Sequence, residues 1–540
     1  MKYKGKDLME YFPLESARGS QKAVLLEIDK AFDAGQKFII LEAPVGSGKS
    51  AIAMTLANAF DSAHIITPRK SLQNQYFDDF SEDVVLMKGR SSYPCTYQSD
   101  PHKYKAIIKH IENGMIQSPD WDEPNCSSAP CKNSNTVFRV CTEETGICPY
   151  SRAMEVAEDH PTVIHNLHSF IYQTNFSQRF TTRDIMIVDE AHEIESVIRG
   201  FITKKINVPK KFDETKVPVS SKSLNDWCNF LSSAECAPSI SAMEARNKRQ
   251  DPEYVTDLDK YNNAVEDLRL SAGYYGDSFT VTFNKKAGSS HDTEFNFIPH
   301  KLGNAASRLI FDFGKRVLLM SGTIYDKAMF CRNLGLNPDD AYFIRIPSTF
   351  PIPNRPIYIK EDYQADTSFV GWNDNFKDII EKIEKIAGIF HDVKGLIHAP
   401  SYEAAEQLYN AIPGNRIVTH TKTNFQEKLS EFYLSKDNKI FISPVCQQGV
   451  DFKEDRARFQ IILRVPYLNT SDDFVRDKVE NDFNWYNYQA LIVFGQQLGR
   501  PVRSESDYGA TFLMDERFNR FISRNSGKIP KWVQQAIIWR

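Results

Sequence analysis

The segment Ala43–Ser50 reads Ala-Pro-Val-Gly-Ser-Gly-Lys-Ser. A single residue, Glu42, separates it from the apolar stretch Phe38–Leu41. This order predicts a buried strand that leads into a glycine-containing loop and then into a helix. The loop residues whose backbone N–H groups can surround phosphate oxygens are Gly46, Ser47 and Gly48. Lys49 is then placed for the β- and γ-phosphates, and the Ser50 hydroxyl for Mg²⁺. The segment therefore predicts an α/β unit that binds a nucleotide.

A second apolar run, Ile185–Val188, ends in Asp-Glu-Ala-His, the residues Asp189–His192. The end of this strand would direct Asp189 toward the same metal ion, and Glu190 could polarise a water molecule in line with the γ-phosphate. The two segments are the two halves of one phosphoryl-transfer site, in the expected order. We therefore expect a chain that hydrolyses a nucleoside triphosphate.

The size and composition of the chain limit the classes it can belong to. At 540 residues it is too long for one core, so we expect two large domains with insertions. Its 41% hydrophobic and 25% charged residues are typical of a soluble globular protein. Neither a membrane-spanning run nor an apolar signal segment after Met1–Lys6 is evident, so we expect a cytoplasmic or nucleoid-associated protein, not a secreted one. With a net charge of −4, a polyanionic partner would need a local basic groove.

Further patterns extend the α/β prediction along the chain. Residues 21–34 and 51–60 are predicted helices on either side of the first strand and its loop. Additional strands of this first unit are predicted at Ala63–Thr67 and at Arg316–Met320, the latter ending in Ser321-Gly322-Thr323. After a proline cluster at Pro351, Pro353 and Pro356, a second α/β unit has predicted strands at 395–398, 440–442 and 461–463.

Two segments interrupt the first unit. From about residue 92 to residue 148 the chain is polar and lacks sustained periodicity, so it needs a covalent or metal staple to hold one shape. Five of the nine cysteines lie there: Cys95, Cys126, Cys131, Cys141 and Cys148. In a reducing compartment, such a group of cysteines indicates ligands of a metal ion or an iron–sulfur cluster more than disulfide bonds. The spacing of the cysteines does not distinguish an iron–sulfur cluster from a zinc ion. The second segment, about 197–308, combines a helical pattern at 244–270 with alternating stretches at 278–283 and 294–298.

The ordered motifs resemble those of superfamily 2 helicases. They are Arg18 and Gln21, the phosphate loop, Asp189–His192, Ser321–Thr323, Gln448–Phe452, and Gln496-x-x-Gly499-Arg500-x-x-Arg503. With the cysteine segment between the phosphate loop and Asp189, the chain is similar to the XPD/DinG-like iron–sulfur DNA helicases from about residue 10 to residue 520. The resemblance implies ATP, Mg²⁺ and a [4Fe-4S] cluster as cofactors.

The resemblance also implies a domain plan with two RecA-like, parallel-sheet motor domains. The first motor domain would comprise residues 1–94, 149–196 and 309–345, and the second would comprise residues 346–540. Residues 95–148 would form the iron–sulfur domain, and residues 197–308 a mainly helical, arch-like insertion.

Several residues acquire implied roles from the family's motifs. Arg18 and Gln21 match the element that reads adenine, although a solvated helix start would also explain them. Gln496, Arg500 and Arg503 match the motif that reaches across to the γ-phosphate. Arg503 would be the arginine finger, and Arg500 would hold it in place. The alternative is a basic surface helix without a role in catalysis. Asp451 would lie at the domain interface, and Gln448 stands where the family commonly has Glu.

The cysteine motifs of the family match only at the two ends of the segment. Gly89-Arg90-x-x-Tyr93-x-Cys95 resembles the site of the first cluster ligand, and Cys148-Pro149-Tyr150 that of the last. The two remaining ligands would come from Cys126, Cys131 and Cys141, and the sequence does not choose among them.

By resemblance, the partner is single-stranded and forked DNA, along which a monomer would move 5′→3′. Candidate contacts follow predicted strands or lie beside the cluster: Thr67, Pro68, Arg69, Gln73, Arg90, Tyr93, Asn166, His168, His398, Ser401 and Tyr402. Two other functions stay open, namely a translocase or RNA-directed motor that does not separate DNA strands, and a non-catalytic DNA-binding scaffold subunit. Intact Lys49, Asp189, Glu190 and Arg503 argue against the scaffold.

Overall fold

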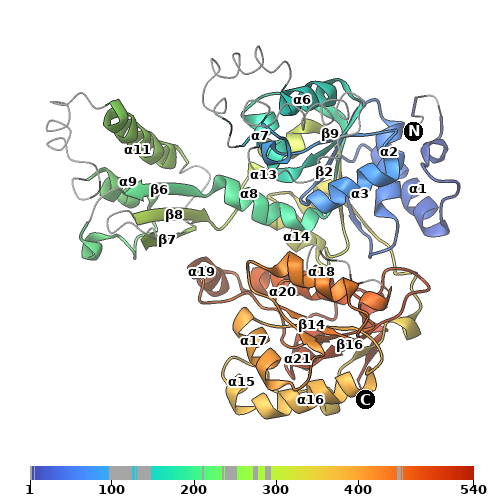
Figure 1. Cartoon of the computed structure of the whole chain (residues 1–540). Coiled ribbons are helices and arrows are strands. Elements are labelled where there is room, and N and C mark those ends of the chain that lie inside the picture. Colours follow the sequence, from blue (N-terminus) through green and yellow to red (C-terminus); the bar gives the residue numbers. More distant parts are fainter. Residues whose placement is uncertain are drawn as a thin grey trace.

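The chain forms two lobes and one inserted domain (Figure 1), as seen in a computed structural model. The structure describes residues 3–4, 6–95, 125–127, 129, 148–208, 212–233, 236, 252–271, 278–285, 293–446, 450, 452 and 454–539. None of the helices in these ranges combines the length and the apolar composition that crossing a membrane requires.

The first lobe is built on a seven-stranded parallel sheet with the strand order β10-β1-β9-β5-β2-β4-β3. Its strands are β1 (Phe38–Glu42), β2 (Ala63–Thr67), β3 (Val85–Met87), β4 (Thr162–Asn166), β5 (Arg183–Val188), β9 (Gly314–Ser321) and β10 (Ala341–Arg345). Both faces of a parallel sheet are covered, which explains why the central strands read as continuous apolar runs.

Two groups of helices cover the two faces of this sheet. One face carries α1 (Gly19–Asp33), α2 (Lys49–Ala59), α3 (Lys70–Phe80) and α6 (Pro149–Asp159). The other carries α7 (Leu167–Asn175), α8 (Ile194–Ile202), α13 (Ala305–Leu309) and α14 (Lys327–Asn333). The apolar side chains of β1 alternate between the two cores, since Ile39 and Leu41 pack with the first group and Ile40 with the second.

The second lobe repeats this design with a second seven-stranded parallel sheet, in the order β13-β14-β12-β15-β16-β11-β17. Its strands are β11 (Ile357–Tyr358), β12 (Gly395–His398), β13 (Ile417–Val418), β14 (Ile440–Ser443), β15 (Phe459–Ile462), β16 (Ala510–Leu513) and β17 (Ile537–Ile538). Its helices are α15 (Gly371–Asp374), α16 (Phe376–Ile389), α17 (Tyr402–Ala411), α18 (Phe425–Leu434), α19 (Asp473–Asn481), α20 (Phe483–Leu498), α21 (Phe518–Arg524) and α22 (Lys531–Gln534). The predicted α/β class with two parallel-sheet motor lobes is confirmed. The exact domain limits stay a prediction.

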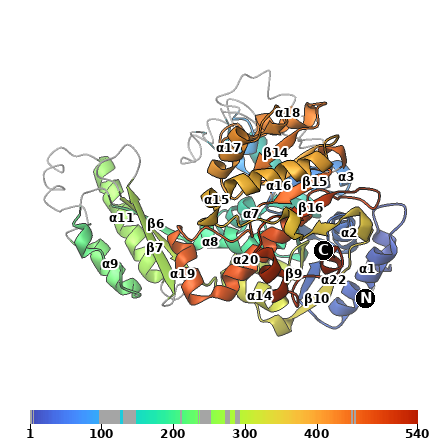
Figure 2. The ribbon, with the colours of Figure 1, turned by 90° about the horizontal axis from the view of Figure 1, so that it is seen from below.

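The insertion lies to one side of both lobes (Figures 1 and 2). Its described part holds an antiparallel sheet of β6 (Lys204–Val208), β8 (Thr293–Pro299) and β7 (Phe279–Lys285), together with α9 (Leu224–Ser232) and α11 (Pro252–Leu270). The expectation of a mainly helical insertion therefore leaves out the sheet, whose Phe295 and Phe297 form the core with Trp227. The alternating stretches of the sequence are β7 and β8, because only one face of this sheet is buried.

The insertion also contacts the second lobe through α19. Thr280 on β7 donates a hydrogen bond to Asp477 Oδ2 (2.7 Å), and the Lys478 ammonium donates to the His300 carbonyl oxygen (3.4 Å). Figure 2 shows α19 beside β7. The inserted domain is thus tied to both lobes and not only to the lobe from which its chain emerges.

Two fully buried histidines pack side by side on neighbouring strands of the first lobe. His64 Nε2 lies 3.0 Å from the Thr181 carbonyl oxygen, which can only accept, so this nitrogen carries the proton. His64 Nδ1 then accepts from His165 Nε2, 3.1 Å away. Burial, aided by the nearby charge of Arg183, lowers the pKa of His64 to about 3, and burial lowers the pKa of His165 well below its usual range. Both rings are neutral in the folded protein.

This pair predicts a loss of stability in mild acid. The unfolded chain binds protons at these rings below about pH 6.5, whereas the folded chain does not, so stability falls with falling pH. Each histidine should cost about 2 kcal/mol of unfolding free energy between about pH 7 and pH 5. Urea unfolding of wild type and of His165→Gln at these pH values measures this loss. The unfolding free energy of the variant should fall less steeply with falling pH than that of wild type. His391→Gln, at an exposed histidine, should keep the wild-type slope. The same pH dependence of the unfolding free energy in all three proteins would contradict the conclusion that the buried histidine pair is neutral.

Candidate functional site

Three sequence motifs meet because their strands are neighbours in the first sheet. The order β1-β9-β5 places the phosphate loop, Ser321–Thr323 and Asp189–His192 at adjacent carboxyl ends. Glu42 pairs in register with Ser321, and Val188 pairs with Leu319. Ligands bind at this edge of open α/β sheets.

The phosphate loop has the backbone shape that its two glycines permit. Gly46 has φ 76° and Gly48 has φ 78°, both in the left-handed region. α2 begins at Lys49, so its first N–H groups lie at the loop and favour an anion there. A β-carbon at Gly48 would lie 2.1 Å from the Gln21 side-chain nitrogen, so the loop is packed tightly as well as turned.

Arg18 and Gln21 hold this loop from outside. The Arg18 guanidinium donates to the Gly46 carbonyl oxygen (2.8 Å), and the Gln21 amide donates weakly to the Gly48 carbonyl oxygen (3.4 Å). Gln21 Oε1 also accepts from the Arg18 main-chain N–H (2.9 Å) at the start of α1. The structure thus places both residues at the phosphate loop, while their contact with adenine stays a prediction.

Asp189 and Glu190 lie together at the end of β5, within the electrostatic reach of Lys49. The Glu190 main-chain N–H donates to Asp189 Oδ1 (2.9 Å), and Glu190 itself has φ 53°, which turns its side chain away from the strand direction. Burial raises the pKa of Asp189, and the Lys49 charge works against that rise. Burial also opposes ionisation of Glu190, but the His192 hydrogen bond and the Lys49 charge outweigh it and hold the pKa of Glu190 well below its usual range. Glu190 is therefore ionised at neutral pH.

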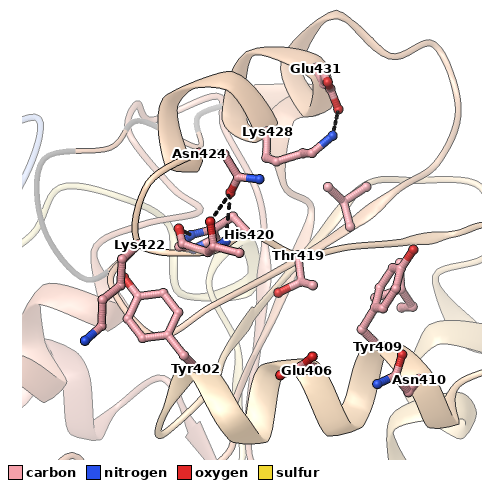
Figure 3. A pocket seen from close by; sticks show the side chains of 13 residues that line it. Tyr402, Glu406, Tyr409, Asn410, Thr419, His420, Lys422, Asn424, Lys428 and Glu431 are labelled. Atoms are coloured by element: carbon pink, nitrogen blue, oxygen red, sulfur yellow. Dashed lines mark hydrogen bonds and ion pairs between the residues drawn. The ribbon is translucent and has the colours of Figure 1, made fainter.

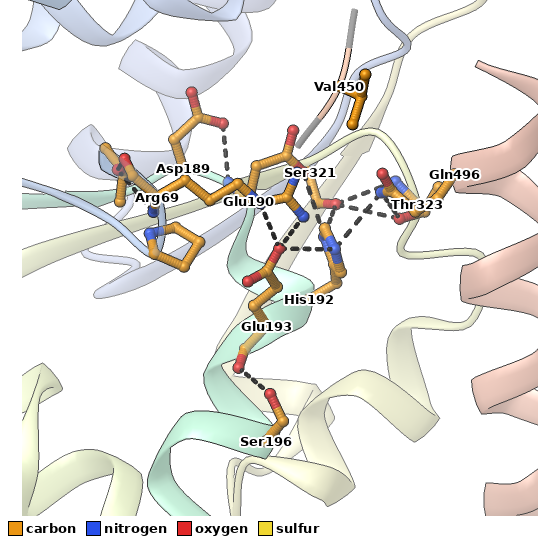
Figure 4. A network of polar contacts seen from close by, with 12 residues as sticks. Arg69, Asp189, Glu190, His192, Glu193, Ser196, Ser321, Thr323, Val450 and Gln496 are labelled. Carbon is orange, nitrogen blue, oxygen red and sulfur yellow. Dashed lines mark hydrogen bonds and ion pairs between the residues drawn. The ribbon is translucent and has the colours of Figure 1, made fainter. Parts of the chain in front are cut away.

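His192 joins the two lobes at this site (Figure 4). Its Nδ1 lies 2.9 Å from Ser321 Oγ and 3.2 Å from a Glu190 carboxylate oxygen. Its Nε2 lies 3.5 Å from the side-chain nitrogen of Gln496, which donates to Thr323 Oγ1 (2.9 Å). Gln496 lies on α20 of the second lobe, so its one side-chain amide contacts two motifs of the first lobe. The sequence contained His192, but nothing in its spacing indicated this linking position.

The two arginines after Gln496 are held in different ways. Arg500 is buried and donates to the carbonyl oxygens of Val450 (2.7 Å) and Gln496 (2.9 Å). Burial and the neighbouring charge of Arg503 lower the pKa of Arg500 to about 9. The Arg503 main-chain N–H donates to Asp507 (3.1 Å), and Arg503 lines a cavity together with Lys49 and Glu190. This placement brings Arg503 to the phosphate loop, with Arg500 fixed behind it.

The cavity between the lobes has a volume of about 80 Å³. Phe350, from the segment that connects the lobes, and the Arg503 carbonyl oxygen both lie against Gly46, where a β-carbon would approach them to 2.3 and 2.7 Å. Ligand pockets are typically a few hundred Å³ or more, so a nucleoside triphosphate requires these segments to move apart. The sequence did not indicate Phe350, because only the tertiary arrangement brings it to the loop.

A separate cavity of about 640 Å³ lies in the second lobe, between α17 and α18 (Figure 3). Tyr402 and Tyr409 line it from α17, and Lys428 lines it from α18. Within the described ranges, no residue of the nucleotide motifs borders it.

Four of the predicted nucleic-acid contacts are wrong, because their side chains are buried. Tyr93 supports the chain beside the cysteines, and Thr67 Oγ1 donates to the Arg69 carbonyl oxygen (2.9 Å). Gln73 donates to main-chain oxygens inside the first lobe, and His398 Nε2 pairs with Gln460 (3.0 Å). Arg69 forms an ion pair with Glu193, and Asn166 caps α7 by accepting from the His168 N–H (3.1 Å). The exposed contacts that the sequence proposes stay predictions.

Three of the five clustered cysteines lie close together. The Cys126 N–H donates to the Tyr93 carbonyl oxygen (2.9 Å), which holds Cys126 beside Cys95, and the Cys126 thiol donates to the Pro94 carbonyl oxygen (3.1 Å). The neighbouring Cys126 thiol, the N–H groups at the start of α6 and the Arg90 charge lower the pKa of Cys148. A cysteine that loses its proton easily can ligate iron or zinc as a thiolate.

The cysteine site is incomplete in the part of the chain that the structure describes. There, no group of three or more histidine, cysteine or acidic side chains is arranged to hold a metal ion. Cys131 and Cys141 lie outside the described residues, as do Gln448 and Asp451. The donor chemistry of Cys95, Cys126 and Cys148 fits a cluster, and a fourth thiolate would have to come from Cys131 or Cys141.

Comparison with known proteins links both lobes to helicases. Residues 387–536 match the family described as helicase C-terminal domain, and residues 15–215 match that described as type III restriction enzyme, res subunit. The chain is 35% identical over 327 residues to the general transcription and DNA repair factor IIH helicase subunit XPD of Dictyostelium discoideum, covering 52% of this chain but only 40% of that protein. A Methanocaldococcus jannaschii protein named "Probable ATP-dependent helicase" is 27% identical over 97% of this chain and 95% of its own length.

Solved structures resemble the chain in fold. One titled XPD helicase has a TM-score of 0.59 at 15% identity and covers 97% of this chain and 100% of its own. The Xpd4 structure from S. tokodaii has a TM-score of 0.53 at 14% identity, covering 96% and 99%. At these identities the likeness shows the fold alone.

The close packing at Gly48 predicts that Gly48→Ala will weaken nucleotide binding. Alanine at this φ costs about 1 kcal/mol of stability, and its β-carbon would also displace Gln21 from the loop. Gly414→Ala is the matched control, because Gly414 has φ 95° and nothing within 4 Å of its β-carbon position. The midpoint temperature of thermal unfolding should fall by a similar amount in both variants. Binding of a fluorescent ATP analogue should weaken about tenfold only in Gly48→Ala. Equal binding by both variants would contradict this reading of the loop.

Proposed function

Because the chain belongs to the XPD/DinG-like group of superfamily 2 helicases, we propose that it hydrolyses ATP to move along single-stranded DNA and to separate duplex strands. The observation that carries the proposal is the contact of Gln496 in the second lobe with Thr323 and His192 in the first. It lies beside the cavity that Lys49, Glu190 and Arg503 share, so both lobes would respond to the same phosphate.

In the proposed hydrolysis, each group acts through its position. Lys49 binds the β- and γ-phosphates, while Ser50 and Asp189 hold Mg²⁺, which neutralises phosphate charge when bound. The ionised Glu190 accepts a hydrogen bond from the attacking water and orients it. Arg503 stabilises the charge that develops on the transferring phosphoryl group, and Arg500 fixes the chain behind it.

Movement would follow from the narrowness of the cleft. Since a triphosphate needs more room than about 80 Å³, binding and release change the distance between Phe350, Arg503 and the phosphate loop. α20 carries Gln496 near one end, and near the other end Trp485 and Gln489 donate to the Glu195 carboxylate (2.7 and 3.0 Å). A change at the phosphate would therefore shift α20 against the first lobe along its length.

DNA is the proposed track, in the 5′→3′ direction, with forked DNA as a substrate and a monomer as the active species. The name of the Dictyostelium relative, a DNA repair factor subunit, supports DNA over RNA. The residues that follow β2 and β12, among them Pro68, Arg69, Ser401 and Tyr402, lie at the carboxyl ends of the two sheets, where a strand could cross both lobes.

We also propose a [4Fe-4S] cluster on Cys95, Cys126 and Cys148, with Cys131 or Cys141 as the fourth ligand. The closeness of Cys126 to Cys148 and to Cys95 supports it, as does the lowered pKa of Cys148. The segment between them has little apolar sequence, so the cluster would act as a structural staple.

Lys49→Ala tests the motor. Loss of the phosphate contact should reduce DNA-stimulated ATP hydrolysis on the order of 100-fold while thermal unfolding stays unchanged. Lys22→Ala, at an exposed lysine on α1, serves as the control and should retain activity.

Strand displacement, measured on DNA forks with a 5′ or a 3′ tail and on matched RNA, then tests the track. Unwinding only from 5′-tailed DNA is expected. Wild-type hydrolysis without any strand separation would favour a translocase, and undiminished hydrolysis by Lys49→Ala would refute the nucleotide site.

Cys148→Ser tests the cluster. The variant should lose iron, sulfide and visible absorbance, because a serine hydroxyl is a poor iron ligand. Cys331→Ser, at a buried cysteine of the first lobe outside the cluster, should retain all three. Anaerobic purification followed by metal analysis gives the measurement. A colourless wild type that contains zinc would overturn the iron–sulfur assignment.

A further inference from the structure

Tyr76 is a fully buried residue of α3 that none of the motifs includes. Its ring packs among the apolar side chains of the first core, as do those of its neighbours Phe77 and Phe80 on the same helix. Unlike theirs, its ring carries a hydroxyl group into the interior. A buried hydroxyl without partners would cost a few kcal/mol, so the partners of this one are informative.

The Tyr76 hydroxyl is directed into the nucleotide site. It donates a hydrogen bond to Asp189 Oδ2 at 3.0 Å. The Ser50 side chain is close enough to work against the rise that burial causes in the pKa of Tyr76. Because an ionised carboxylate can only accept, the Tyr76 proton is committed to Asp189.

We infer that Tyr76 is a positioning residue for the magnesium ion, acting by holding the Asp189 carboxylate, near Ser50, in one orientation from which it can bind the cation. The inference rests on the proposed ATP hydrolysis, because Ser50 and Asp189 are the residues assigned to Mg²⁺ there. Partners that orient metal ligands commonly affect metal affinity without touching the metal.

The local structure suits this role. The Asp189 carboxylate is fixed on both oxygens, since Oδ1 accepts from the Glu190 N–H (2.9 Å) and Oδ2 from Tyr76. Such a carboxylate cannot rotate freely, which lowers the entropy lost on binding an ion.

α3 itself is anchored against the same segment. Arg69, at the start of the helix, forms an ion pair with Glu193, four residues beyond Asp189. Arg69 directly precedes α3, and Tyr76 lies within it. The Asp189–Glu193 segment is therefore contacted at two points, by Arg69 at the start of the helix and by Tyr76 farther along it.

Tyr76→Phe tests the inference, because phenylalanine keeps the buried ring and removes only the hydroxyl. The Mg²⁺ concentration for half-maximal ATP hydrolysis should rise about tenfold, and kcat should recover at saturating Mg²⁺. Tyr261→Phe is the matched control: Tyr261 is a buried tyrosine of the insertion whose hydroxyl donates to the Leu231 carbonyl oxygen (2.6 Å). Its Mg²⁺ dependence should equal that of wild type.

A second measurement does not depend on turnover. Binding of a fluorescent ATP analogue is titrated with Mg²⁺ in wild type, Tyr76→Phe, Asp189→Asn and the double variant. The Tyr76→Phe shift should appear in the wild-type background and vanish in Asp189→Asn, because the hydroxyl acts through that carboxylate. This arm reports on Tyr76 even if the protein does not hydrolyse ATP, so failure of the proposed function and failure of the inference are distinguishable.

Two results would overturn the inference. One is an unchanged Mg²⁺ dependence in Tyr76→Phe. The other is a loss of kcat that saturating Mg²⁺ does not restore in a variant with wild-type thermal unfolding, since this would indicate a role other than metal positioning. If Tyr76→Phe did not fold, the tyrosine could be replaced by 3-fluorotyrosine, which keeps the hydroxyl but makes it a stronger acid. A changed Mg²⁺ dependence would then support the inference, and an unchanged one would overturn it.

Discussion

The hydrogen-bonded register of three neighbouring strands, β1, β9 and β5, is the constraint on which the rest of the site depends. Parallel pairing brings the carboxyl ends of these strands to one edge, although they are separated by well over a hundred residues in the chain. The phosphate loop, the Ser321 segment and the Asp189 segment are then neighbours without further adjustment. A slip of one residue would turn the side chains of one motif to the opposite face of the sheet and separate it from the others.

The contact between the lobes is polar at the nucleotide site and apolar beside it. His192, Ser321, Thr323 and Gln496 exchange hydrogen bonds in a small buried cluster, while Tyr488 on the same helix α20 packs into a core of the first lobe. Hydrogen bonds of this kind are directional, so a small shift of α20 breaks them, whereas apolar packing tolerates sliding more readily. Such an interface suits two lobes that change their spacing while remaining in contact.

Much of the fold could be predicted because buried parallel strands leave continuous apolar runs in the sequence. The runs that end at Leu41, Val188 and Met320 were found for this reason, and each lies in a strand of the first sheet. Short or edge strands such as β13, which has two residues, leave no such signal. Tyr93 and His398 illustrate the opposite error, since aromatic or polar character near a strand end does not reveal that a side chain points inward.

The sequence by itself determined the chemistry of the site: a glycine loop with Lys49 and Ser50, an acidic pair after a buried strand, and the arginines that follow Gln496. Local spacing is enough for these features, because each motif is a short segment whose backbone geometry is set by its own residues. Only the tertiary structure decided that His192 links the lobes, that Phe350 lies on the phosphate loop, and that Tyr76 donates to Asp189. Those contacts join residues far apart in the chain, and their existence depends on how whole helices pack, which no local pattern encodes.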